Sequence, residues 1–139
     1  MKKFAKRWKA GIIKNLPRVF DADGVYQRPF ALKGTPSQYT GATKIHDYIE
    51  AGMAAANKLF EIINLEVETH PCIEDNVVFV EFFLSGKSMA TSETFRIASS
   101  AALISFKDGK IIQYRDFPNS AGIAQAAGTL QQYAASLTK

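Results

Sequence analysis

A twelve-residue stretch near the C-terminus, Asp108–Asn119 (DGKIIQYRDFPN), constrains the fold of this chain more than any other. Its Asp-Gly dipeptide is typical of a tight turn between two strands. The residues that follow, Lys110–Phe117, have the composition of a β-strand that a proline ends. Because side chains alternate along a strand, Ile112, Tyr114 and Asp116 should share one face. The other face then carries Ile111, Gln113, Arg115 and Phe117. A carboxylate therefore ends an apolar row, either at a solvated strand end or in a pocket.

The rest of the chain supplies the partners of this strand, because its hydrophobic pattern changes from helical spacing to alternation near Phe60. Helices are predicted over residues 3–14, Leu16–Phe20, from Thr40 or Thr43 to Leu59, and over Ser120–Leu137. Asp21–Gly24 should end the second helix, and Ala31–Thr40 should form a loop. The buried face of the third helix should carry Ile45, Tyr48, Ile49, Met53 and Ala56. Strands are predicted over Val25–Phe30, Ile63–His70, Asn76–Ser85 and Glu93–Phe106. This order predicts one α+β domain over residues 1–139, in which N-terminal helices cover the concave face of a curved antiparallel sheet. Such a cone-shaped arrangement, open at one end, is a natural place for a small-molecule pocket.

Charge and cysteine content narrow the class of protein. Seven basic residues and no acidic one lie in the first 18 positions, and the remaining residues carry a net charge of −3. We interpret the basic first helix as a solvated face and expect no nucleic-acid or membrane partner. Contact of that helix with nucleic acid or an anionic membrane is the less favoured alternative. A single cysteine, Cys72, excludes an internal disulfide, and the N-terminus lacks the apolar run of a secretory signal, so we expect a cytoplasmic protein.

Two pairs of residues are candidates for chemistry. Tyr26 and Arg28 are two positions apart on the first predicted strand, as Tyr114 and Asp116 are on the last, so each pair shares a face. If both faces line the cone, a carboxylate, a guanidinium and two phenols converge there. Burial would raise the pKa of Asp116 and a neighbouring arginine would lower it. Asp116 is then either a general acid/base or half of an ion pair with Arg28 or Arg115.

Other polar residues have weaker signals. Glu81 lies in a very apolar strand, where a charge needs a partner, and it either pairs with Arg96 on the neighbouring strand or is a second pocket acid. His46 and His70 are isolated and show no metal-ligand spacing, so no metal and no cofactor are expected. Phe30 and Trp8 complete the set of expected substrate-binding residues, together with Tyr114 and Glu81.

Two stretches resemble the nuclear transport factor 2-like superfamily of cone-shaped α+β proteins, in particular its SnoaL-like and limonene-epoxide-hydrolase-like branches. The first is FDADGVYQRPFALKGTPSQYTGATKI (Phe20–Ile45), similar to an aspartate turn, short strand, proline and glycine-led helix in that family. The second is FKDGKIIQYRDF (Phe106–Phe117), similar to the family's strand that contains a Trp-Arg-Asp motif. The resemblance covers essentially the whole chain and specifies fold better than activity, because this fold hosts isomerases, hydrolases, cyclases and non-catalytic binders.

The resemblance implies roles for individual residues. Asp116 corresponds to the aspartate of the epoxide hydrolases, and Tyr26 is kept from their Tyr-x-Asn pair, whose asparagine is replaced by Arg28. Their Arg-x-Asp pair is missing, since the matching segment VFVEFFL offers only Glu81. The ketosteroid isomerases match less well, because Arg28 stands at the place of their catalytic aspartate and Ala102 near that of their second acid.

The expected function is therefore a cofactor-independent enzyme of isomerase, cyclase or epoxide-hydrolase type. It would act by acid/base chemistry on a small apolar substrate, with Asp116, Tyr26 and Arg28 as catalytic residues. The alternative is a non-catalytic small-molecule-binding or dimerisation module of the same fold. An open cavity walled by Asp116 and Tyr26 favours the enzyme, and a cone filled by Phe30, Phe79 and Trp8 favours the module. Members of the family usually pair through the sheet, which implies a homodimer through the apolar run Ile97–Ile104.

Overall fold

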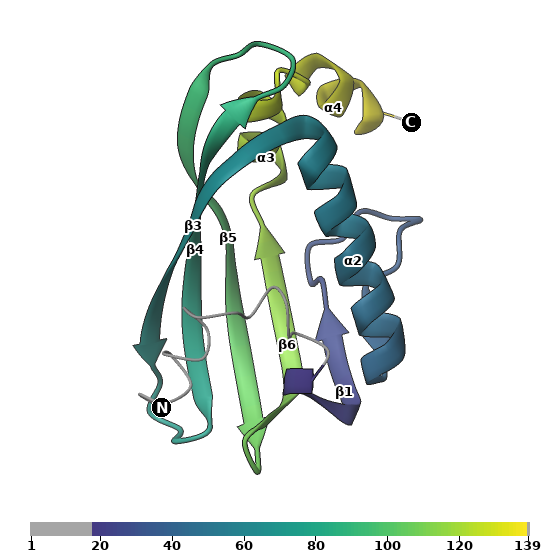
Figure 1. The fold of residues 1–139 in the computed structure, drawn as a ribbon. Coiled ribbons are helices and arrows are strands. Elements are labelled where there is room, and N and C mark those ends of the chain that lie inside the picture. Colours follow the sequence, from purple (N-terminus) through teal and green to yellow (C-terminus); the bar gives the residue numbers. More distant parts are fainter. Residues whose placement is uncertain (1–17, 139) are drawn as a thin grey trace.

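The computed structural model describes residues 18–138, which form a curved six-stranded sheet with helices packed on one face and at one end (Figure 1). The predicted α+β class is confirmed. The predicted helix over residues 3–14, and Trp8 with it, lie outside the described residues. In chain order the elements are β1 (Phe20–Gln27), β2 (Gln38–Thr40), α2 (Ala42–Leu59), β3 (Phe60–Pro71), β4 (Val77–Ser88), β5 (Thr94–Lys107), β6 (Lys110–Pro118), α3 (Ser120–Ala127) and α4 (Leu130–Ser136).

The strands lie in the order β2-β1-β6-β5-β4-β3. The consecutive strands β3, β4, β5 and β6 pair antiparallel, as predicted, and the β5–β6 turn is Asp108-Gly109, with φ of 52° and 78°. The sheet is mixed, however, because β1 lies parallel to β6. The sequence predicted a sheet that is antiparallel throughout, and this prediction is wrong for the β1–β6 pair. The reason is that α2 separates β1 from the meander, so no hairpin fixes the direction of β1.

The core lies between the concave face of the sheet and α2. Figure 1 shows α2 running obliquely along β1, while α3 and α4 lie at the end of the sheet toward which β1 and β6 point. Ile45 is the buried residue of α2, at 0% exposure, and Tyr48 and Ile49 pack beside it, as the helical spacing predicted. The strand residues of the same cluster are Phe20, Tyr26, Val78, Val80, Phe82, Ala102, Ile104, Ile111 and Tyr114.

Strand β1 begins earlier than predicted. Phe20 was expected to be the last residue of a helix that Asp21–Gly24 ends, but all of these residues belong to β1. The pairing with β6 shifts between Phe20 and Val25, so the segment between them bulges from the ladder. Gly24 sits in this bulge because a Cβ there would lie 3.0 Å from two carbonyl oxygens, those of Asp21 and Ile111.

A second bulge changes which isoleucine of β6 faces the core. Ile111 pairs with Phe106, whereas Gln113 pairs with Ser105, so Ile112 is an extra residue on β6. Simple alternation placed Ile112 with Tyr114 and Asp116, but Ile111 is the fully buried residue. The prediction holds beyond the bulge, where Tyr114 and Asp116 face the core together.

Helix boundaries depend on glycines. Thr40 or Thr43 was expected to cap α2, but the N-cap is Gly41, which has φ of 93° and donates its N–H to the carbonyl of Gly24 at 2.9 Å. This bond ties the start of α2 to β1. The C-terminal helix, predicted as continuous, is two helices, because Gly128 ends α3 in the left-handed conformation with φ of 74°.

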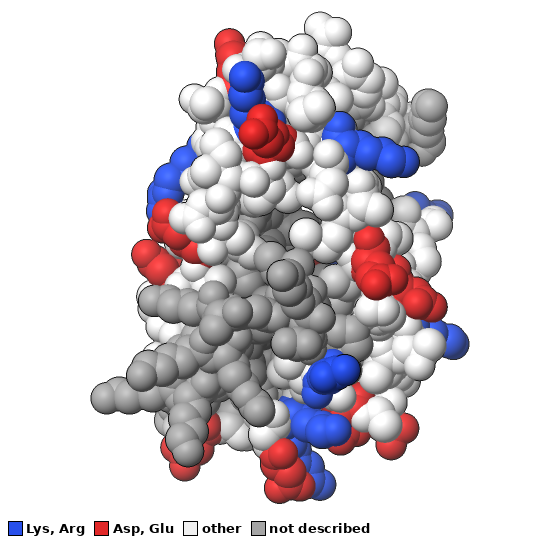
Figure 2. Space-filling model, in the orientation of Figure 1, with Lys and Arg blue, Asp and Glu red and all other residues white. Residues whose placement is uncertain are grey.

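The described surface carries charges of both signs. On the face drawn in Figure 2, the blue and red side chains of the described residues are interspersed around its margin and form no continuous basic area. Within the described part of the chain, no helix has the length and apolar character needed to span a membrane.

Candidate active site

The centre of the candidate site is Asp116, near the end of β6. It lies on the core face of the strand and is 9% exposed, which makes it the one buried acidic residue among those described. Directly opposite on β5 is Ala102, whose small side chain leaves room for the carboxylate. A carboxylate buried here needs hydrogen-bond donors around it.

Tyr26 supplies such a donor from β1. The parallel register places Tyr26 beside Tyr114, and their rings stack with centroids 4.9 Å apart and planes 13° from parallel. From this position the Tyr26 hydroxyl donates a hydrogen bond of 2.5 Å to Oδ2 of Asp116. The two strands thus present the predicted residues to each other, although they are 90 positions apart in the chain.

Two further tyrosines enclose this pair. The Tyr48 ring of α2 lies 5.3 Å from that of Tyr26, and the Tyr39 ring of β2 stacks on Tyr48 at 4.4 Å. The sequence had placed Tyr48 on the buried face of its helix but gave it no role in the site. It gave no signal for Tyr39, which lies in a segment predicted as a loop and forms part of a three-residue strand.

Arg28 follows β1 and faces the same cluster. Its guanidinium carbon lies 5.9 Å from the centre of the Tyr48 ring. Within the described chain, Asp116 forms no salt bridge with Arg28 or Arg115, so the ion-pair alternative is not what the structure shows. The guanidinium instead acts on Asp116 through its charge at longer range.

The environment raises the pKa values of Asp116, Tyr26 and Tyr114. Burial raises the pKa of Asp116 above its usual 3.8, and the Tyr26 hydrogen bond and the Arg28 charge oppose that shift without cancelling it. Burial also raises the pKa of Tyr26 and Tyr114, and the nearby Asp116 carboxylate raises both further. The phenols therefore remain protonated as donors, and Asp116 is the group of this cluster that gains or loses a proton.

An open cleft of about 400 Å³ lies beside this cluster, where the C-terminal ends of β1 and β6 meet α3. Arg28 belongs both to its wall and to the surroundings of Asp116. The wall does not include Asp116 or Tyr26. It is lined by Arg28, Phe30, Ala31, Leu32, Thr35, Pro118, Asn119, Ser120, Ala121 and Tyr133.

The other predicted site residues lie elsewhere. Phe30 is 76% exposed and contacts the Phe117 ring at 5.2 Å, at the mouth of the cleft. Phe79 is on the outer face of β4, so neither phenylalanine fills the cone. Glu81 also lies on that outer face, away from Asp116.

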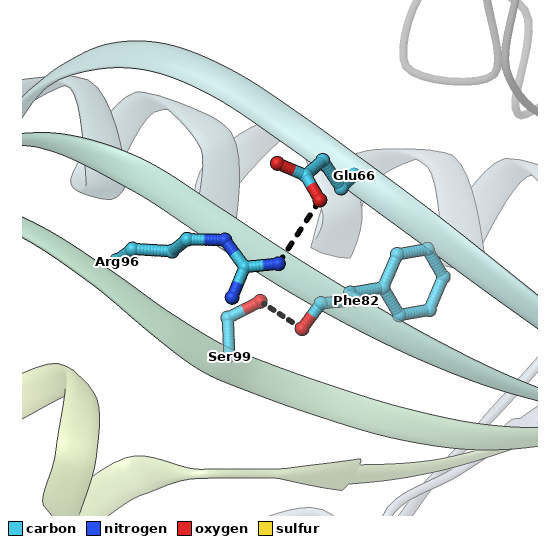
Figure 3. A network of polar contacts seen from close by, with 4 residues as sticks. All are labelled: Glu66, Phe82, Arg96 and Ser99. Atoms are coloured by element: carbon cyan, nitrogen blue, oxygen red, sulfur yellow. Dashed lines mark hydrogen bonds and ion pairs between the residues drawn. The ribbon is translucent and has the colours of Figure 1, made fainter.

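The partner predicted for Glu81 is wrong. Arg96 of β5 pairs with Glu66 of β3 at 3.0 Å, reaching across β4 (Figure 3). Its guanidinium carbon lies 4.8 Å from the centre of the Phe83 ring. Glu81 instead contacts His70, with Nε2 and Oε1 2.9 Å apart. Arg96 lies opposite Ser85, four positions from Glu81 along β4, whereas Ala101 is the residue opposite Glu81. The β4–β5 register shifts between Phe82 and Phe83, and the Ser99 hydroxyl donates to the Phe82 carbonyl there at 3.3 Å (Figure 3).

One group of possible metal ligands lies on the same outer face. Glu68 pairs directly opposite Glu81, and one ligand atom from each of Glu68, His70 and Glu81 lies within 4.8 Å of the others. His70 is thus not isolated, as the sequence suggested. The group is largely exposed and lies on the face of the sheet opposite Asp116.

Comparison with known proteins agrees with this architecture. The profile of the SnoaL-like domain family matches residues 1–114. The chain is 28% identical over 120 residues to the uncharacterized protein YesE of Bacillus subtilis (strain 168), covering 84% of this chain and 76% of that protein.

Solved structures give the same result. A Bacillus subtilis protein provisionally assigned as an isomerase superposes with a TM-score of 0.67 at 25% identity, covering 92% of this chain and 89% of that one. A Catenulispora acidiphila protein of ketosteroid isomerase-like fold, in complex with trimethylamine, superposes with a TM-score of 0.59 at 19% identity, covering 90% and 88%. The second likeness shows the fold, which is the cone predicted from the sequence.

Proposed function

Because the chain belongs to the SnoaL-like domain family, we propose that it is an enzyme that transfers protons on a small apolar substrate, with Asp116 as the acid/base. The observation that carries the proposal is the buried Asp116 carboxyl hydrogen-bonded to Tyr26. A carboxyl of raised pKa, held by the Tyr26 hydroxyl in an apolar wall, is suited to accept a proton and to return it.

The chemistry we propose is an isomerase or cyclase reaction through an enolate. Asp116 removes a proton from a carbon next to a carbonyl and later returns one to the rearranged product. Tyr26 holds the carboxylate in place throughout, since its own pKa is raised. Arg28 provides the positive charge that stabilises the developing oxyanion. Epoxide hydrolysis is the weaker option, because Glu81, the one charged residue at the place of the hydrolases' Arg-x-Asp pair, lies on the far face of the sheet.

The relatives support this class of reaction without fixing the substrate. The Bacillus subtilis structure is provisionally assigned as an isomerase. A Mesorhizobium loti protein of 20% identity is provisionally assigned as a SnoaL-like polyketide cyclase. A buried carboxylate can serve the proton transfers of either class of reaction.

The experiment that tests the proposal begins with a panel of small apolar carbonyl compounds, epoxides and steroids, first scored by the rise in melting temperature that a ligand of the native state produces. For a compound that the wild type converts, Asp116→Asn should lower kcat by about 10²–10⁴-fold, the usual contribution of one general acid/base. The matched control is Asp108→Asn, the same change in the exposed β5–β6 turn, which should leave kcat unchanged. Equal turnover by wild type and Asp116→Asn would refute the assignment.

A non-catalytic binding module is the second candidate. The observation in its favour is that Arg28 lines the described cleft and Asp116 does not. In that case the panel yields ligands that raise the melting temperature but no compound that is converted. Asp116→Asn would then leave both the ligands and their affinities unchanged.

We also propose a homodimer through the outer face of the sheet. Phe79 of β4 lies directly opposite Leu103 of β5, and both are partly exposed on that face. Sedimentation at micromolar concentration should give a dimeric mass for the wild type and a monomeric one for Leu103→Glu. Lys44→Glu on the exposed face of α2 is the control and should remain dimeric. A monomeric wild type would refute the dimer.

A further inference from the structure

The cleft at the ends of β1 and β6 is electropositive on two sides. One side of the cleft carries Arg28. Among the described residues that line the cleft, Arg28 is the charged one and none is acidic. The other side is formed by Asn119, Ser120 and Ala121, the N-cap and first turn of α3. A helix N-terminus carries a partial positive charge. Its N-cap, Asn119, already accepts the Gly122 N–H at 3.0 Å, so the charge of the helix end, and not that N–H group, acts on the cleft. Both features favour an anion between them.

The Arg28 guanidinium has capacity for that anion. Its Nε is buried, and it has no hydrogen-bond partner among the described residues. Nor does Arg28 form a salt bridge there, in contrast to Arg96, which holds Glu66 at 3.0 Å. A buried donor without a partner costs free energy that an incoming acceptor recovers. The planar donor fork of an arginine matches the two oxygens of a carboxylate.

The remainder of the cleft suits a flat apolar group. Phe30, Leu32, Pro118 and Tyr133 supply apolar and aromatic surface on several sides of the space. The volume of about 400 Å³ is in the usual range for small-molecule sites and exceeds that of a two-ring ligand.

We propose that this cleft binds a small aromatic carboxylate, whose carboxylate accepts hydrogen bonds from the Arg28 guanidinium and whose ring lies against Phe30 and Tyr133. The inference rests on the proposed function only where it identifies this ligand with the substrate. The binding itself requires Arg28 and the cleft, and it does not require Asp116.

Such binding has a consequence for Asp116. The positive charge of Arg28 lowers the pKa of Asp116 in the free protein. A bound carboxylate offsets part of that charge and adds a like charge nearby. Both effects favour the protonated form of Asp116. The ligand therefore converts Asp116 toward a proton donor, as the protonation half of an isomerase or cyclase reaction requires.

The test compares naphthalene carboxylate with its neutral carboxamide by isothermal titration calorimetry on the full chain at low salt. We expect the wild type to bind the carboxylate about 10- to 100-fold more tightly than the amide, the usual effect of hydrogen bonds to a charged group. Arg28→Gln should remove this preference, and Arg28→Lys, which keeps the charge but not the fork, should retain part of it.

Arg115→Gln is the matched control, because Arg115 lies on the outer face of β6 and does not line the cleft. It should leave the preference unchanged. Melting curves establish that each variant is folded. If Arg28→Gln does not fold, Arg28→Lys decides the test, because its preference for the carboxylate over the amide should be smaller than that of the wild type. Equal affinity of the wild type for the two probes, no binding of the carboxylate, or an unchanged preference in Arg28→Gln would each overturn the proposal.

The two proposals fail separately. If Asp116→Asn abolishes turnover and Arg28→Gln leaves the carboxylate preference intact, the acid/base role stands and the carboxylate site is wrong. If Asp116→Asn keeps full turnover while Arg28→Gln removes the preference, the carboxylate site stands and the acid/base role is wrong. Proton uptake on carboxylate binding, lost in Asp116→Asn, is expected when both hold.

Discussion

Replacing Tyr26 by phenylalanine tests the central contact of the site without any substrate. The change removes one hydroxyl, whose hydrogen bond to Oδ2 of Asp116 measures 2.5 Å, and keeps the ring that stacks on Tyr114. This hydrogen bond lowers the pKa of Asp116 against the larger effect of burial. Its loss leaves burial less opposed, so the pKa of Asp116 should rise further.

The size of the effect follows from the burial of both partners. A hydrogen bond to a charged group contributes about 1.5–3 kcal/mol in folded proteins. One unit of pKa corresponds to about 1.4 kcal/mol of differential interaction between the two protonation states. Since Asp116 is 9% exposed, water replaces the lost donor poorly. Tyr26→Phe should therefore disfavour the ionised form of Asp116 by about 1.5–3 kcal/mol, and its pKa should rise accordingly.

The assay is an NMR titration of the isotope-labelled Asp116 carboxyl in wild type and Tyr26→Phe, with Tyr39→Phe as control. Tyr39 belongs to the same ring cluster and makes no side-chain hydrogen bond to Asp116, so its loss should change the pKa little. The stability difference between wild type and Tyr26→Phe should also widen as pH rises through the folded-state pKa of Asp116 in the wild type, which lies above 3.8. The unfolded chains titrate alike, so the difference comes from the variant, whose carboxyl stays protonated to higher pH. An Asp116 pKa that is unchanged or lower in Tyr26→Phe would refute the reasoning.

Three further variants test the fold and its charge balance. Asp116→Asn should melt at a temperature equal to or above that of the wild type at neutral pH, with the advantage vanishing at and below pH 3.8, because burial disfavours the ionised carboxyl. Ile45→Ala should cost about 2–5 kcal/mol in a urea titration, and Ile63→Ala, at an exposed position, much less. Gly86→Ala should cost about 1–3 kcal/mol in the same titration, since its Cβ would lie 2.6 Å from the Glu61 carbonyl oxygen. A destabilised Asp116→Asn, equal costs for the two isoleucines, or a neutral Gly86→Ala would contradict the respective argument.

Local patterns in the sequence predicted the elements well. The Asp108-Gly109 dipeptide marked the turn into β6, and the spacing of Ile45, Tyr48 and Ile49 gave the buried side of α2. These features depend on neighbours within a few positions, so a single sequence contains them. The two positive-φ glycines at helix ends, Gly41 and Gly128, were present in the sequence but give no local sign of which turn they form.

These local patterns do not predict the register in which one strand pairs with the next. A bulge shifts pairing by one residue, and each shift moves side chains along or across the sheet. For that reason Ile111 is buried in place of Ile112. Arg96 lies opposite Ser85, four positions from Glu81 along β4, and reaches Glu66. The pairing of Tyr26 with Asp116 was predicted only as two residues that share a pocket, because nothing local relates strands 90 positions apart.

The direction of β1 is the unpredicted feature on which the site depends most. Because β1 runs parallel to β6, both strands end at the same edge of the sheet. Arg28, just after β1, and the first turn of α3, just after β6, are therefore brought to one cleft. An antiparallel β1 would carry Arg28 to the opposite end of β6, a distance of about 25 Å for a strand of this length. Asp116 would then be buried without a nearby cation, and the cleft would lose its positive charge. The parallel pair thus explains why a carboxyl, its phenol donor and the Arg28 guanidinium meet in one place.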